Sequence, residues 1–168
     1  MIPFFVWAFL SSGISDWVTL GIFALAAITD ALDGAIARKQ NIVTDFGKLM
    51  DPLADKVMVM TAFICFTAAG ILHPVITIII MTREFLVTGL RSIASTRGKV
   101  IAADIWGKLK TISQDAAVIA VLLKSAFGAG DGSFLGIAEH IFVAAMTVLT
   151  LVSALNYCWK NKEFFKDN

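Results

Sequence analysis

Long apolar segments, separated by short polar breaks, run along the whole chain. A short apolar start and five segments of helix length follow one another: Met1–Ser11, Leu20–Arg38, Phe46–Ala69, Pro74–Ser95, Ile105–Phe127 and Phe134–Trp159. The breaks are rich in glycine and serine, as in residues 11–13 and 128–132, which is typical of short loops. Because a helix needs about 20 predominantly apolar residues to cross a bilayer, the pattern predicts an all-α integral membrane bundle of six transmembrane helices. Residues 1–168 are expected to form a single domain.

The first segment is shorter than the others. About a dozen helical residues rise only ~18 Å, whereas the hydrocarbon core of a bilayer is ~30 Å thick. We therefore expect a truncated first helix, whose cytoplasmic start lies outside this sequence, rather than a re-entrant segment.

The basic residues are distributed unevenly between the two ends of the predicted bundle. They follow the second, fourth and sixth segments: Arg38, Lys39, Lys48, Arg97, Lys99, Lys108, Lys110, Lys160, Lys162 and Lys166. The loops at the other end hold Asp16, His73 and Asp131, and only Lys124 lies near one of them. By the positive-inside rule, the loops after segments two and four and the C-terminus face the cytoplasm. We expect a multi-pass protein of the bacterial inner or plasma membrane.

Composition agrees with a membrane protein and argues against two kinds of site. Hydrophobic residues make up 58% of the chain and the mean hydropathy is +0.80, whereas soluble domains are about 45–50% apolar. Cys65 and Cys158 lie in apolar segments without a CxxC or Cys/His cluster, which disfavours thiolate metal sites and disulfides. The formal net charge of +1 is uninformative by itself, and no nucleic-acid partner is expected.

One stretch of the chain gathers acidic, basic and small residues at helical spacing. It reads Asp30-x2-Asp33-Gly34-x2-Ala37-Arg38-x8-Gly47-x3-Asp51-x3-Asp55. Residues three or four positions apart share a helix face, so the acids form one stripe before the short loop and another after it. Four carboxylates from two antiparallel neighbours can then converge near the cytoplasmic side. Crowded carboxylates in a membrane need cations, and their oxygens favour Mg²⁺, Mn²⁺ or Ca²⁺, with two ions suiting a phosphoryl reaction.

The small residues of this stretch have two interpretations. Each of Gly34, Ala37 and Gly47, taken alone, is best explained as a close contact between membrane helices. Together they leave room for a diphosphate or a nucleotide ring to approach the backbone, and Arg38 can pair with phosphate. The set as a whole favours ligand binding.

This stretch resembles the motif of the CDP-alcohol phosphotransferase family at all eight of its fixed positions. The resemblance covers most of the chain, because that family also has a six-segment fold. It implies that Asp55 is the general base and that the metal ligands are Asp30, Asp33, Asp51 and Asp55. It also implies CDP-diacylglycerol binding at Asp30, Gly34, Arg38, Thr44 and Gly47. Two Mg²⁺ or Mn²⁺ ions and a homodimer are expected on the same grounds.

Four basic residues of the fourth and fifth segments bear on which alcohol accepts the transferred group. Arg83 and Arg91 lie in one segment, and Lys108 and Lys110 open the next at the cytoplasmic side. We expect the four to form a basic pocket for an acceptor phosphate. The surrounding residues resemble those of the family's phosphatidylglycerophosphate synthases. That resemblance implies phosphatidyl transfer from CDP-diacylglycerol to sn-glycerol 3-phosphate, with phosphatidylglycerophosphate and CMP as products.

Other interpretations stay open. Glu84 can simply neutralise Arg83 or Arg91, and the two lysines can reflect topology or lipid headgroups. Asp115 is expected to be a contact within the bundle rather than a catalytic group. Another family activity is possible, such as that of a phosphatidylinositol-phosphate, phosphatidylserine or cardiolipin-type synthase. A divalent-cation transporter would explain the acids but not Arg38 or the basic pocket, and a purely structural membrane protein would leave the acids without a purpose.

Overall fold

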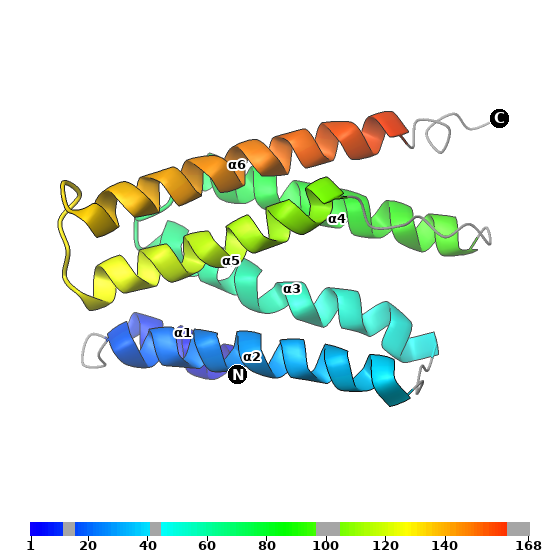
Figure 1. Ribbon diagram of the computed structural model, residues 1–168, viewed down its shortest axis with the longest axis horizontal. Helices are drawn as coiled ribbons and strands as arrows, with labels where there is room; N and C mark the ends of the chain where they lie inside the picture. Colours follow the sequence, from blue (N-terminus) through cyan, green and yellow to red (C-terminus); the bar gives the residue numbers. More distant parts are fainter. Residues whose placement is uncertain (12–15, 41–44, 97–104, 161–168) are drawn as a thin grey trace.

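Six helices make up the part of the chain that the structure describes (Figure 1). The computed structural model describes residues 1–11, 16–40, 45–96 and 105–160, with side chains for all of these except 30–55, 92–93 and 95–96. The helices are α1 (Ile2–Leu10), α2 (Asp16–Gln40), α3 (Asp45–Ala68), α4 (Pro74–Thr96), α5 (Ile105–Ala126) and α6 (Phe134–Lys160). The described residues contain no strand, so the predicted all-α class and helix order are confirmed.

The ends of the helices follow the local sequence. Pro74 begins α4, where the fixed φ of proline suits the first turn. Gly70, just beyond α3, has a φ of 74°, and the Ile71 N–H donates to the Phe66 carbonyl at 2.9 Å. Gly128 closes α5 in the same way with a φ of 58°. Both are Schellman motifs, in which glycine tolerates the left-handed backbone that ends the helix.

Consecutive helices run in opposite directions along the long axis of the bundle (Figure 1). The C-terminal ends of α1, α3 and α5 therefore lie at the same end as the N-terminal ends of α2, α4 and α6. Within the bundle, α5 packs against α6 and α2, α4 packs against α6, and α1 packs against α2 and α3. This is the alternation that the six apolar segments predict.

The apolar core draws on all six helices. Its members include five side chains that are at most 2% exposed: Phe5, Phe23, Phe63, Val118 and Met146. These residues come from α1, the first half of α2, the second halves of α3 and α5, and the first half of α6, and Ile80 adds α4 with a side chain that is 1% exposed. Buried charged and amide side chains gather in the middle of α4 and the first turns of α5, namely Arg83, Glu84, Lys110 and Gln114, while α6 adds buried Glu139 and Ser153. The interior thus has an apolar part and a polar part.

Large apolar side chains also cover the outside of the bundle. Examples that are more than half exposed are Leu25, Ile78, Ile112, Ile141 and Leu155, from α2, α4, α5 and α6. An apolar exterior of this kind is typical of a surface that meets lipid or another protein. Within the described residues, α6 is the one helix that is long and apolar enough to cross a membrane, with a mean hydropathy of 1.9. The all-helical bundle is established, and the six membrane spans stay a prediction.

Candidate active site

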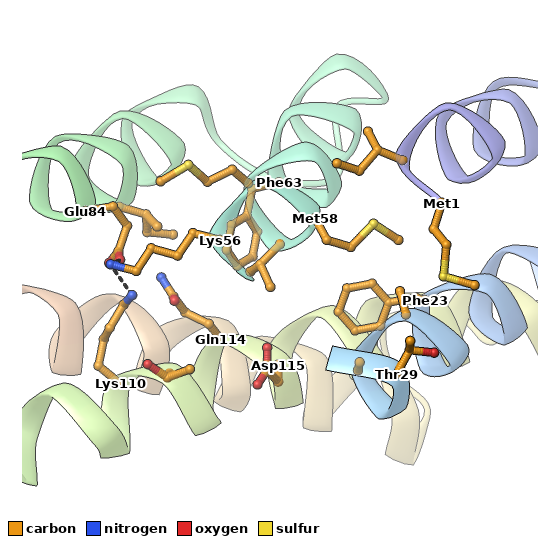
Figure 2. Close-up of a pocket in the computed structure, with 17 residues that line it drawn as sticks. Met1, Phe23, Thr29, Lys56, Met58, Phe63, Glu84, Lys110, Gln114 and Asp115 are labelled. Carbon is orange, nitrogen blue, oxygen red and sulfur yellow. Dashed lines mark hydrogen bonds and ion pairs between the residues drawn. The ribbon is translucent and has the colours of Figure 1, made fainter. Parts of the chain in front are cut away.

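A cavity of about 600 Å³ lies among α2, α3, α4, α5 and the start of α1 (Figure 2). Its apolar end is lined by residues that include Met1, Phe23, Met58 and Phe63. Its polar end is lined by Lys56 from α3, Glu84 from α4, and Lys110 and Gln114 from α5. Ligand sites commonly combine an apolar wall with a few convergent polar groups, so this cavity has the make-up of a binding site.

The carboxylate of Glu84 is the centre of the polar end. It is 3% exposed and contacts three cations. Its Oε2 lies 2.9 Å from Nζ of Lys56, and its Oε1 lies 3.2 Å from Nη1 of Arg83. The same Oε1 pairs with Nζ of Lys110. One carboxylate on α4 therefore holds side chains of α3 and α5 together.

Two hydroxyl groups extend this ion cluster. Nζ of Lys56 donates to Oγ1 of Thr88 at 3.2 Å, one turn beyond Glu84 on α4. Nη2 of Arg83 donates to Oγ of Ser153 at 2.6 Å, which brings α6 into the cluster. Four helices thus meet around a single buried negative charge.

Among the side chains that the structure describes, the cluster holds more positive than negative charge. Three cations share one carboxylate, and the side chains of Arg83 and Lys110 are only 8% and 3% exposed. Buried charges are unfavourable unless they are paired, and Nε of Arg83 has no hydrogen-bond partner among the residues that the structure describes. An anion that enters the polar end would improve this balance. The arrangement is therefore suited to a group such as a phosphate.

The predicted acidic motif borders this cavity. The following predicted site residues lie outside the described side chains: Asp30, Asp33, Gly34, Arg38, Thr44, Gly47, Asp51 and Asp55. The backbone is nonetheless helical up to residue 40 and again from residue 45, and α2 contacts α3, so the two acidic stripes lie on neighbouring helices. Thr29 and Lys56, which flank the motif in the sequence, both line the cavity.

The convergence of the four carboxylates stays a prediction. Among the side chains that are described, no group of three or more His, Cys, Asp or Glu residues could hold a metal ion.

The four residues predicted to bind the acceptor phosphate do not all come together. Lys110 lines the cavity, and Arg83 is joined to it through their shared carboxylate. Arg91 is exposed, with its guanidinium 6.0 Å from the centre of the Tyr157 ring. Lys108 is exposed near the start of α5. Neither Arg91 nor Lys108 lines the cavity, and their role in binding stays a prediction.

The cavity is also lined by two charged residues and one amide that sequence analysis does not assign to a site: Lys56, Asp115 and Gln114. Charge placement is one signal that could have found Lys56, because an ionisable residue inside an apolar segment needs an opposite charge, which Glu84 supplies. Spacing is the signal for Gln114, which follows Lys110 by four residues and so shares its helix face. The expectation that Glu84 neutralises one of the arginines is confirmed for Arg83.

Comparison with known proteins agrees with the motif. The sequence model of the CDP-alcohol phosphatidyltransferase family matches residues 1–155. A CDP-diacylglycerol–glycerol-3-phosphate 3-phosphatidyltransferase of Bacillus subtilis is 42% identical over 146 residues, covering 86% of this chain and 74% of that protein. A protein of the same name from Rickettsia felis is 32% identical over 166 residues, covering 98% and 91%. Another from Rickettsia typhi is 35% identical over 144 residues, covering 86% and 80%. The chain therefore belongs to the CDP-alcohol phosphatidyltransferase family.

Proposed function

We propose that this protein transfers a phosphatidyl group from CDP-diacylglycerol to sn-glycerol 3-phosphate, giving phosphatidylglycerophosphate and CMP. The observation that carries the choice of acceptor is the buried excess of cations at the polar end of the cavity. Lys56, Arg83 and Lys110 offer partners to a phosphate, which glycerol 3-phosphate carries and serine or choline lacks. The names of the relatives from Bacillus and Rickettsia support the same choice.

The position of Lys56 links acceptor binding to the chemistry. It directly follows Asp55 in the sequence, so an acceptor whose phosphate is held by this lysine lies at the same turn of α3 as the proposed base. Asp55 accepts the proton of the 1-hydroxyl, and the resulting oxygen nucleophile attacks the β-phosphorus of CDP-diacylglycerol. The bond from that phosphorus to the bridging oxygen breaks, and CMP leaves. Arg38 pairs with the diphosphate.

Divalent metal ions are part of this proposal. The donor set is Asp30, Asp33, Asp51 and Asp55, on two helices that are in contact. Carboxylate oxygens are hard ligands, so this set fits two Mg²⁺ or Mn²⁺ ions. Such ions supply charge stabilisation to the diphosphate when bound.

The protein is also proposed to be a multi-pass membrane protein and a homodimer. Its apolar exterior supports contact with lipid, and the basic residues near one end support an active site and a C-terminus that face the cytoplasm. The acyl chains of CDP-diacylglycerol then stay in the bilayer while its headgroup reaches the cavity. The homodimer is proposed from family resemblance.

The test is metal-dependent release of CMP by the purified protein, supplied with CDP-diacylglycerol and one alcohol at a time. We expect release with glycerol 3-phosphate and not with serine, inositol phosphate or phosphatidylglycerol. Asp51→Asn is the loss-of-function control, because it removes a predicted metal ligand and keeps the side-chain shape. Release with a different alcohol would indicate another activity of the family. Cation flux through liposomes without CMP release would indicate a transporter instead.

A further inference from the structure

The amide of Gln114 is a buried polar group without a partner in the described protein. Its side chain is 4% exposed and lines the cavity, and Nε2 makes no hydrogen bond with any residue that the structure describes. Figure 2 shows Gln114 extending from α5 toward the amino groups of Lys56 and Lys110. Buried amides are nearly always paired, because leaving one unpaired is unfavourable. We therefore expect a ligand to supply the hydrogen-bond partner of the Gln114 amide.

The neighbouring residue shows that this turn of α5 can satisfy a polar side chain locally. Ser113 is buried, and its Oγ donates to the carbonyl of Lys110 at 2.7 Å. Gln114 forms no such bond and lines the cavity instead. A methionine of similar length would fill the same space without an unpaired donor. The amide is thus better explained by recognition than by packing.

The position of Gln114 decides which part of a ligand it meets. It lies four residues after Lys110, one turn along the same helix face and about 6 Å along the axis. The side chains of Lys56 and Lys110 only donate, which suits a phosphate, whereas an amide both donates and accepts, which suits a hydroxyl. A ligand that offers a phosphate and a nearby hydroxyl is a phosphorylated polyol.

We propose that Gln114 is a specificity-determining residue that hydrogen-bonds the 2-hydroxyl of the acceptor. The inference rests on the proposed function and deepens it. The phosphate is held by the cations around Glu84, and the 1-hydroxyl is used in the reaction at Asp55, so the 2-hydroxyl is the group left for the amide. An acceptor without this hydroxyl leaves the buried amide unpaired in the complex, and the site rejects it.

The probe is 3-hydroxypropyl phosphate, which has the phosphate and the reacting hydroxyl of glycerol 3-phosphate and lacks only the 2-hydroxyl. CMP release is measured with each acceptor for the wild-type protein, Gln114→Met and the control Ser113→Ala. For the wild type we expect kcat/KM to be roughly 10- to 100-fold higher with glycerol 3-phosphate. Gln114→Met loses this preference, because its activity falls with glycerol 3-phosphate and stays within about twofold with the probe. Ser113→Ala keeps the preference.

The possible outcomes separate this inference from the proposed function. Equal activity of the wild type with both acceptors would overturn the role of Gln114 and leave the proposed function standing, and this result does not depend on any variant folding. Equal losses with both acceptors in Gln114→Met would show a purely structural role. No release from the wild type with either acceptor would overturn the proposed function and this inference with it.

Discussion

The buried carboxylate of Glu84 gives the sharpest prediction about stability. Glu84→Gln keeps the size and shape of the side chain and removes its charge, so three cations lose their shared anion. Lys56 is 31% exposed and can turn toward water, but Arg83 and Lys110 remain buried with like charge. The substitution therefore leaves two buried cations in the middle of the bundle without a carboxylate partner among the described side chains.

The size of the loss in stability follows from the two cations that stay buried. Removing one partner of a buried ion pair costs about 3–5 kcal/mol, because the remaining charge is buried without compensation. For a chain of this length, each kcal/mol lowers the unfolding midpoint by about 2–4 °C. We expect Glu84→Gln to lower the midpoint by about 6–20 °C. The double variant Glu84→Gln/Lys110→Gln removes one of the stranded cations and should recover part of that loss.

The chain offers both a reporter and a matched control. Cys65 is 6% exposed and Cys158 is only partly buried, so in a Cys158→Ser background a thiol-reactive fluorophore reports unfolding in detergent through Cys65, and midpoints are compared at one scan rate. The control is Glu139→Gln, another buried glutamate, which lies 2.6 Å from Nζ of Lys124. Lys124 is 20% exposed and keeps Asp131 at 2.5 Å, so this loss should be ~1 kcal/mol.

Two results would refute the reasoning. If Glu84→Gln melts within about 2 °C of the wild type, the three cations do not depend on Glu84 for their burial. If Glu139→Gln is destabilised as strongly, the effect reflects the loss of any buried carboxylate. Failure of the double variant to recover would show that stranded positive charge is not the cause.

Three further predictions concern metal, acceptor and packing. Chelation by EDTA should abolish CMP release and added Mg²⁺ should restore it, whereas activity that persists in EDTA would contradict the metal proposal. Lys110→Met should raise KM for glycerol 3-phosphate about tenfold or more, because a charge-assisted bond is lost, while Lys108→Met at the surface should change it far less. Gly136→Ala should lower the unfolding midpoint, because its Cβ would lie 2.6 Å from the Gly130 carbonyl oxygen, at a cost of about 1–3 kcal/mol. Gly21→Ala has no atom within 4 Å of its Cβ and should not destabilise the protein, and equal midpoints for the two variants would contradict this packing argument.

The helices could be predicted from the sequence because apolar runs and loop residues agree with each other. The largest discrepancy is at the start of α2, which begins at Asp16 rather than at Leu20. Apolar continuity marks only Leu20, whereas the carboxylate of Asp16 favours the first turn of a helix. It also accepts a hydrogen bond from Oγ of Ser125 at 2.7 Å, a tertiary contact that the local sequence does not show.

The basic site could be predicted only in part, because helix geometry separates residues that look close in the sequence. Arg83 and Arg91 are eight residues apart, which is two turns plus roughly 80° of rotation, so one is buried and the other is exposed. Lys108 and Lys110 are two apart, roughly 200° around the helix, and face opposite sides. The partner that organises the buried pair is Glu84. Its central place depends on packing among four helices and not on spacing within one.

A buried cluster is also a better place than the surface for recognising a small phosphorylated acceptor. Cations such as Arg91 and Lys108 are exposed to salt, and at a membrane surface they would also meet lipid phosphates. Lys110 and Arg83 are shielded from such competition, so a phosphate that reaches them interacts more strongly. The same shielding makes their excess charge unfavourable in the empty protein. The carboxylate of Glu84 reduces the unfavourable free energy of the buried cations but does not cancel it. The empty site is therefore stable enough to fold, and a bound anion stabilises it further.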